Sequence, residues 1–498
     1  MKTFSIIQTI KKKWTTHRLV SSEKTPNFIM LGSLLFLLTE LAPLCNNQNN
    51  LNHATTGLEQ TLQQRRYNEF LNTAEKNPWY SSSNNKLLLN LDTGIAEVFN
   101  GNFSTGRKKL ISVGKMSEGY YTKSITLNIL SVLTNDLTLP YYGEDYELVF
   151  AGSIAALAYA ASGDIEDALV EARLSEHRLN VMSTSYEGKK KYSDDAFAHY
   201  LAGMLFEADG NYNDAVVSYK RAYNSYGGRF FPDRPEKLTH ALIGASIAGN
   251  IDPGFGFQSI ADTLKFYDKK LSLRSDPDFS DEYIRNTMIF IAFTGKGPKK
   301  VENILNAHFT DEGVDYLIKI ALPDMVSRES SIASVRFRLD NGEKQDMELA
   351  ADYNHIGVNA FKDKRNFLYA KTVARVSARY LIFKETKDKA LEKLKKKYDK
   401  EVEENGKDSD KARNIKLKMR GTALAIDLLS NELLEQADTR HSLALPGNAF
   451  VARVPVLPDS HHVQVEYLDR LGNVLDTEKR TINFEPESGF VELFTALF

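Results

Sequence analysis

The apolar positions between Asp194 and Tyr226 recur at the 3.6-residue spacing of two short amphipathic helices. The cluster Asp209-Gly210-Asn211 interrupts this periodicity in the middle of the segment. A breaker cluster between two periodic runs predicts a helical hairpin. Small residues fall where the two helices would touch, and these are Ala202, Gly203, Ala215 and Ala222.

Two earlier stretches, Leu87–Leu110 and Tyr146–Leu179, repeat this organisation and carry their turn glycines at Gly101 and Gly163. Gly203, Phe206, Gly210, Tyr212, Ala215, Tyr219 and Ala222 have the order and spacing of the tetratricopeptide unit, a helix pair that stacks on copies of itself. The three turn glycines lie farther apart than the roughly 34 residues of a contiguous array. The pattern therefore predicts an irregular helical array with extra segments between the units.

Helical periodicity also extends on both sides of these units. The additional predicted helices are Leu58–Leu71, Leu238–Ala248, Phe257–Leu271 and Asp281–Phe293. We expect one all-α tetratricopeptide-like domain over residues 58–294, with a domain boundary at Gly295-Lys-Gly-Pro298.

The pattern changes after this boundary, because apolar and polar residues alternate as they do in half-buried strands. The predicted strands are Tyr316–Leu322, Ala333–Leu339, Lys344–Leu349, Ala449–Val456, His461–Leu468, Val474–Phe484 and Phe490–Leu497. Asn341-Gly342 between two of them indicates a hairpin. A helix over Phe367–Tyr398 and a second one through Ala437 interrupt the strands. We expect an α+β domain over 299–498, a small β-sandwich with a helical hairpin inserted at about 366–437.

The first residues have the pattern of an export signal. Basic residues precede an apolar run, Phe28–Leu44, and Cys45 and a polar tether over 46–57 follow it. The end of the run resembles a bacterial lipoprotein signal, in which Cys45 would be acylated after removal of the preceding residues. The alternatives are an uncleaved signal anchor in the inner membrane, since about 17 apolar residues can just span a bilayer, or a cytoplasmic protein with an apolar tail. We expect a membrane-anchored lipoprotein of the cell envelope that faces the periplasm.

The composition and motifs of the chain exclude several classes of function. The formal net charge of −2 over 498 residues gives no global reason to expect nucleic acid or an acidic membrane as the partner. A single cysteine excludes an intrachain disulfide. The sequence has no phosphate-binding loop, no His-Glu-x-x-His pair and no Gly-x-Ser-x-Gly elbow. We therefore predict no catalytic residue, no metal site and no cofactor.

One cluster of charged residues has two interpretations. Glu144, Glu147, Glu171, Arg173 and Glu176 fall on or near the two helices of the second unit. Paired carboxylates in an open cleft would suit an enzyme that acts on the cell wall. The alternative is a structural clamp in which Arg173 pairs with Glu144 or Glu147, and we expect the clamp.

The tetratricopeptide template also predicts a binding groove. It places Phe197, Tyr200, Met204 and Glu207 on the inner helix of the 194–226 unit, where they would contact a protein or an extended peptide. For Phe197 and Tyr200 the alternative is core packing. The charged hairpin 384–420 is typical of a solvated surface, although anionic lipid heads or wall polymers are an alternative ligand. Three functions remain open: a scaffold for protein partners, an enzyme of the cell wall, and a periplasmic protein that binds lipid or polymer.

Three segments together resemble an uncharacterised family of bacterial lipoproteins with tetratricopeptide-like helices and a C-terminal β-containing region. They are residues 140–180, with Tyr-Gly-Glu-Asp-Tyr-Glu and Val-Glu-Ala-Arg, residues 192–223, and residues 437–467, with Ala-Asp-Thr-Arg. The resemblance implies no activity and no catalytic residues. Some relatives are encoded beside an outer-membrane lipoprotein activator of peptidoglycan synthases, which implies a partner in the peptidoglycan-synthesis machinery.

Overall fold

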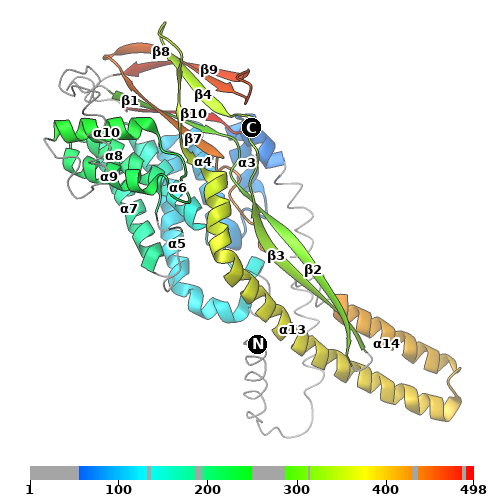
Figure 1. The fold of residues 1–498 in the computed structure, drawn as a ribbon. Helices are drawn as coiled ribbons and strands as arrows, with labels where there is room; N and C mark the ends of the chain where they lie inside the picture. The colour runs from blue at the N-terminus through cyan, green and yellow to red at the C-terminus, as the bar shows by residue number, and fades with distance from the viewer. Residues whose placement is uncertain are drawn as a thin grey trace. The chain divides into compact units, whose positions relative to one another are not determined.

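The computed structural model describes residues 55, 57–131, 136–184, 192, 194–249, 287–311, 314–428, 436–484 and 490–498. Residues 52–498 form one compact unit. It has a helical N-terminal part and a sheet-containing C-terminal region, as the sequence predicts (Figure 1). The predicted signal, Cys45, most of the tether and the predicted helix 257–271 lie outside the described residues.

The helical part is built of antiparallel hairpins in which α4 packs on α5, α6 on α7 and α8 on α9. Its elements are α3 (Tyr67–Lys76), η1 (Ser83–Asn85), α4 (Lys86–Phe99), α5 (Phe103–Ser131), η2 (Asp136–Thr138), α6 (Asp145–Ala160), α7 (Ile165–Thr184), α8 (Ala196–Ala208), α9 (Tyr212–Ser225) and α10 (Glu236–Ala248).

The three predicted turn glycines all end a helix in the left-handed conformation. The φ angles of Gly101, Gly163 and Gly210 are 82°, 78° and 74°, a region that costs other residues energy because of their Cβ atom. Gly203 serves packing instead, since a Cβ at this position would lie 2.3 Å from the ring of Tyr219. The sequence pattern therefore locates both the turns and a close contact between α8 and α9.

Two four-stranded sheets follow, with strand orders β10-β1-β7-β6 and β5-β4-β8-β9. Their strands are β1 (Thr287–Thr294), β4 (Ser334–Leu339), β5 (Gln345–Asp346), β6 (Glu348–Asp352), β7 (Asn448–Pro455), β8 (Asp459–Leu468), β9 (Val474–Phe484) and β10 (Val491–Ala496). All neighbours pair antiparallel except β1 and β10, which pair parallel.

Strand β1 shows how the layers are joined. Every second residue of β1, namely Ile289, Ile291 and Phe293, belongs to the core shared with the helices. The residues between them, Met288, Phe290 and Ala292, belong to the core between the two sheets. The helical prediction for 287–293 is therefore wrong. A strand buried on both faces is a continuous apolar run, which periodicity alone cannot distinguish from a buried helix.

The helical part and the sheets thus share one hydrophobic core across the predicted boundary at 295–298. The ring of Phe293 lies 5.4 Å from that of Phe99 in α4 and 5.8 Å from that of Phe150 in α6, measured between centroids. The structure places the first sheet as a middle layer between helices and the second sheet.

Two long hairpins extend from this body (Figure 1). One pairs β2 (Lys299–Asp311) with β3 (Val314–Val326), and the other packs α13 (Tyr353–Asn405) against α14 (Asp410–Leu428). Helix α13 has 53 residues, about 80 Å at 1.5 Å per residue. It begins earlier and ends later than predicted, whereas α14 ends before the predicted Ala437. We call α13 from Phe367 onward, together with α14, the arm.

Candidate functional site

The N-terminus of α6 carries a buried carboxylate that connects three segments. Glu147 accepts hydrogen bonds from the Tyr141 hydroxyl at 2.5 Å and from the Glu144 amide at 2.9 Å, which completes a capping box. Its other oxygen accepts from the amide of Ser442 at 2.9 Å. Burial, together with the charge of Glu144, raises the pKa of Glu147 to about 7.

Glu144 connects the same helix to both long hairpins. Its two carboxylate oxygens lie 2.5 Å from Nζ of Lys300 on β2 and 3.0 Å from Nζ of Lys364 on α13. Burial alone would raise the pKa of Glu144, but the charges of the two lysines outweigh it and lower the pKa. The carboxylate therefore stays ionised and holds the bases of β2 and α13 against the helical part.

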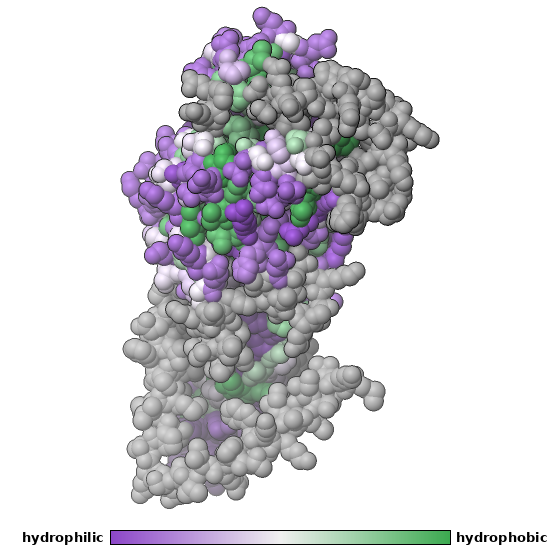
Figure 2. All heavy atoms as spheres, turned by 90° about the vertical axis from the view of Figure 1, so that its left-hand side faces the viewer, coloured by the Kyte–Doolittle hydropathy of each residue, from purple (hydrophilic) through white to green (hydrophobic). Residues whose placement is uncertain are grey.

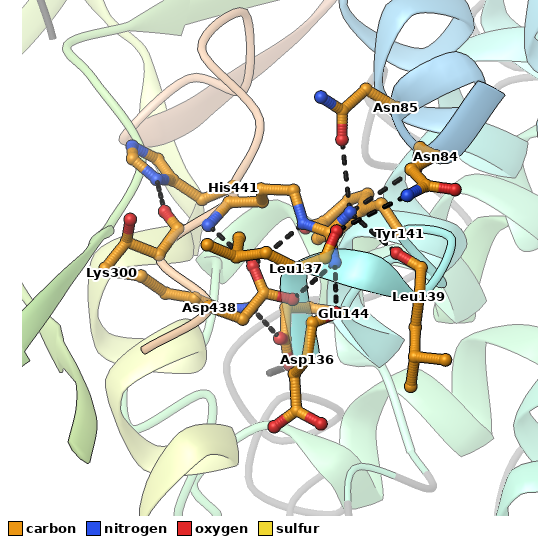
Figure 3. Close-up of polar contacts among 12 residues, drawn as sticks. Asn84, Asn85, Asp136, Leu137, Leu139, Tyr141, Glu144, Lys300, Asp438 and His441 are labelled. Carbon is orange, nitrogen blue, oxygen red and sulfur yellow. Dashed lines mark hydrogen bonds and ion pairs between the residues drawn. The ribbon is translucent and has the colours of Figure 1, made fainter. Parts of the chain in front are cut away.

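Arg440 is the centre of the neighbouring polar contacts, and Figure 3 labels its partners Asn85, Asp136, Leu139 and Asp438. Its side chain donates to the carbonyl oxygens of Leu139 at 3.0 Å and Asp136 at 3.1 Å, and to Asn85 Oδ1 at 3.1 Å. It also donates to the Asp438 carboxylate at 2.8 Å. A planar guanidinium with five donors can satisfy such a ring of acceptors, and a lysine cannot.

The carboxylate of Asp136 extends this cluster to α13. It lies 2.8 Å from Nζ of Lys371 and 3.0 Å from Nη1 of Arg375. We call the cluster the polar junction and define it as Asp136, Glu144, Lys300, Lys364, Lys371, Arg375, Asp438 and Arg440. It joins η2, α6, β2, α13 and the segment 436–447, so it fixes the direction in which the arm leaves the body.

A second buried carboxylate, Asp92 of α4, holds the backbone of the same 436–447 segment. Its Oδ1 accepts from the Ser442 hydroxyl and from the amides of Leu443 and Ala444, and its Oδ2 accepts from the Tyr80 hydroxyl. Burial raises the pKa of Asp92 to about 6. The sequence pattern does not indicate Asp92 or Arg440 as site residues, although Arg440 ends the Ala-Asp-Thr-Arg run that carries part of the family resemblance.

The structure corrects the predicted Arg173 clamp. The guanidinium of Arg173 lies over the ring of Phe206, 5.1 Å from its centroid, whereas lysines pair with Glu144. The register of the α6–α7 hairpin is the reason, because a Cβ at Gly152 would lie 2.1 Å from Oγ of Ser175. This register places Arg173 roughly 15 Å along the helix from Glu144.

The carboxylates of the predicted cluster do not converge. Glu176 contacts His199 Nδ1 at 3.1 Å and Arg221 Nη1 at 3.2 Å instead of Glu144 or Glu147, and Glu171 belongs to the middle of α7. Glu147 is buried among its donors. These positions do not form the pair in an open cleft that the enzyme interpretation requires.

The four predicted groove residues lie inside the molecule. Phe197, Tyr200 and Met204 belong to the main hydrophobic core, and Glu207 forms an ion pair with Arg453 of β7. The core-packing alternative therefore holds for Phe197 and Tyr200. The first sheet lies against α8 and covers the face that the template assigns to a ligand.

The exposed apolar side chains are arranged differently on the helical part and on α13. On the helical part they are few, and Figure 2, which views the side where α7–α10 lie, shows apolar patches broken by hydrophilic atoms. Val170, Leu174 and Val217 are the large exposed ones on α7 and α9. On α13 the large exposed ones are Phe367, Val373, Leu381 and Ile382, and of these Phe367 (66% exposed) and Leu381 (50% exposed) share one helical face.

Membrane-spanning helices and metal-ion sites are both absent from the described part of the chain. No helix there has the length and apolar character needed to cross a bilayer. No group of three or more His, Cys, Asp or Glu side chains in those residues is arranged to hold a metal ion. Comparison with protein-family models, with curated proteins and with solved structures finds no match to this chain.

Proposed function

We propose that this chain is an envelope-tethered scaffold, lipid-anchored at Cys45, whose arm binds an amphipathic helix of a partner protein. The observation that carries the proposal is a continuous apolar line on the outer face of α13. It consists of Phe367, Ala370, Ala374, Ala378 and Leu381, and none of these five side chains is buried.

The spacing of these residues is helical. Steps of three, four, four and three residues keep all five on one face over about four turns, or roughly 21 Å. Phe367 and Leu381 provide large contacts at the two ends, while the alanines between them would let a second helix approach closely. The opposite face of the same stretch is buried and includes Thr372, Arg375 and Val376.

The polar junction supports presentation of this line in a fixed direction. Lys364, Lys371 and Arg375 pair with carboxylates of the helical part on both sides of Phe367. A helix held at its base loses less conformational entropy when a partner binds, so its affinity benefits from preorganisation.

The hairpins α4–α5, α6–α7 and α8–α9 are part of the same proposal, as tetratricopeptide-like units. Their left-handed turn glycines and the close contact of Gly203 with Tyr219 support this assignment. The inner face of these hairpins packs against the first sheet. Because the predicted groove is therefore filled, we place partner binding on the arm. The family resemblance suggests a partner in the peptidoglycan-synthesis machinery.

Site-specific photo-crosslinking in cells tests the proposal. A benzophenone amino acid replaces Phe367 in the full chain, and a matched probe replaces Leu471, which is exposed in the turn between β8 and β9. We expect a discrete adduct with another protein from position 367 and none from 471. Leu381→Glu should abolish the adduct, because a charge would then lie in the apolar interface.

Three outcomes would overturn the proposal: no adduct at 367, an adduct that survives Leu381→Glu, or an adduct that contains only a second copy of this chain. Differently tagged copies distinguish the last case. Labelling with a radioactive fatty acid tests the anchor separately, and label that persists in Cys45→Ala would exclude lipidation at this residue.

A further inference from the structure

The outer face of α14 combines cations and leucines in one line. Arg413, Leu417, Arg420 and Leu424 follow each other at steps of four, three and four residues, so they share one helical face. Leu417 is 69% exposed and Leu424 is 62% exposed. Both arginines are exposed as well, and Arg413 donates to the backbone carbonyl of Asp408. The inner face, with Ala412 and Ile426, packs against α13.

The charge along the middle of α14 has one sign, because its two aspartates lie at the ends: exposed Asp410 begins the helix, and Asp427 pairs with Lys387 of α13. Residues 411–420 contain five Lys or Arg residues and no Asp or Glu. The cations of the neighbouring segment of α13 differ, because Lys389, Lys396 and Lys400 each lie within 3.7 Å of a glutamate on the same helix. The alternation of signs that indicates a solvated surface therefore applies to this segment of α13 and not to α14.

We infer that this face of α14 binds the surface of an anionic phospholipid bilayer. The cations would lie among the headgroups, while Leu417 and Leu424 would enter the boundary with the acyl chains. A soluble polyanion would use the cations but would leave two exposed leucines in water, so the leucines favour a lipid surface. The inference is independent of the protein partner proposed for α13.

The length of the patch suits an interfacial contact. Arg413 to Leu424 covers about 16 Å of helix, so the line can lie flat on a membrane. Each cation near an anionic leaflet strengthens binding about fivefold. Three cations removed together should therefore weaken binding about 100-fold, and salt should weaken it further by screening.

Vesicle binding by the full chain tests the inference. The protein is first held in nanodiscs of phosphatidylcholine, so that its N-terminal anchor, whether an acyl chain on Cys45 or the apolar segment 28–44, already lies in lipid. It is then mixed with sucrose-loaded vesicles of phosphatidylcholine alone or with 30% phosphatidylglycerol, and the pelleted fraction is measured. We expect pelleting only with phosphatidylglycerol, reversed by 0.5 M salt.

A matched pair of triple variants assigns the binding to this face. Arg413→Gln, Lys416→Gln and Arg420→Gln together should weaken binding about 100-fold. The triple variant Lys389→Gln, Lys396→Gln and Lys400→Gln removes the same charge from α13 and should weaken it less than tenfold. Equal losses in the two variants, or equal pelleting with both kinds of vesicle, would overturn the inference.

A fluorescent probe reports whether the leucines enter the bilayer. Gly421 lies beside the line, and a side chain there would meet no atom within 4 Å. Cys45 is the only cysteine, so Cys45→Ser with Gly421→Cys gives a single attachment site for an environment-sensitive dye. We expect a blue shift with phosphatidylglycerol vesicles that Leu417→Asn with Leu424→Asn removes. A shift that persists in this variant would overturn insertion of the leucines.

Discussion

Arg453 of β7 and Glu207 of α8 form an ion pair inside the molecule. Nη2 of Arg453 lies 2.6 Å from Oε1 of Glu207, and the two side chains are 5% and 7% exposed. The hydroxyl of Tyr219 donates to the same glutamate and accepts from Nη1 of Arg453 at 3.1 Å. This network joins the α8–α9 hairpin to the first sheet, so the predicted groove residue Glu207 is part of an internal joint.

Removal of one partner should destabilise the protein more than removal of both. Arg453→Met leaves Glu207 as a buried carboxylate without its cation, which should lower the free energy of unfolding by about 3–5 kcal/mol. Arg453→Met combined with Glu207→Met replaces the pair by apolar side chains and should recover most of this loss. Urea denaturation of the wild type, Arg453→Met, Glu207→Met and the double variant measures the difference. A double variant as unstable as the sum of both single variants would contradict the prediction.

Two glycines in helices should respond to alanine with opposite signs. Gly203→Ala places a Cβ 2.3 Å from the Tyr219 ring, which its hydroxyl bond to Glu207 holds in place. This overpacking should cost about 1–3 kcal/mol of unfolding free energy. Gly421→Ala on the exposed face of α14 meets no neighbour and should add about 0.5–1 kcal/mol through helix propensity. Thermal melts of both variants check the signs, and a neutral Gly203→Ala would exclude the close packing.

Local patterns were sufficient for most elements, but they assigned β1 to a helix and predicted no strand over β2. The breakers at Gly101, Gly163 and Gly210 act within a single turn, so the sequence locates those turns without knowledge of the rest of the chain. The apolar run Met288–Phe293 depends on layers that cover it from both sides. Its burial is a property of the assembled fold, and for this reason periodicity could not assign it.

The partners of the buried polar groups could not be predicted from local sequence patterns either, unless they are close in the sequence. Glu147 could be predicted as a capping residue because its partner Glu144 is three residues away. Arg440 lies about 300 residues from Leu139, and Lys300 of β2 lies more than 150 residues from Glu144. Nothing within either neighbourhood indicates such a partner, so the local pairing with Arg173 was the natural and incorrect choice.

His199 should titrate well above its ordinary range. Burial alone would lower the pKa of His199, but hydrogen bonds to Asp194 at 2.9 Å and Glu176 at 3.1 Å raise it to about 9. The stability from this raised pKa is complete below the unfolded value of about 6.5 and is lost as the pH rises through 9. His199→Gln should remove a loss on the order of 3 kcal/mol between pH 6.5 and 9.5. NMR titration of the imidazole checks the pKa directly, and a midpoint near 6.5 would refute the two bonds.

Glu147 should make the protein more stable as the pH falls from 8 to 5. Burial raises its pKa to about 7, above the ordinary 4.5, so the folded state binds the proton more tightly than the unfolded state. The resulting stability is complete below pH 4.5 and is lost as the pH rises through 7, with a magnitude on the order of 3 kcal/mol.

Glu147→Gln isolates this effect from the other groups that titrate in the same range, including Asp92, whose pKa burial raises to about 6. In the wild type, backbone and hydroxyl donors bind both carboxylate oxygens of Glu147. In the variant, the amide nitrogen of glutamine must therefore face one of these donors, with which it cannot form a hydrogen bond. The variant therefore carries a cost that does not depend on pH. The measurement is the difference in unfolding free energy between wild type and variant at pH 5 and at pH 8. Glu144 does not disturb it, because its lowered pKa contributes stability above pH 4.5 and loses it only below that value. A difference about 3 kcal/mol larger at pH 5 is expected, and equal differences would show that Glu147 is not held in a buried, proton-binding site.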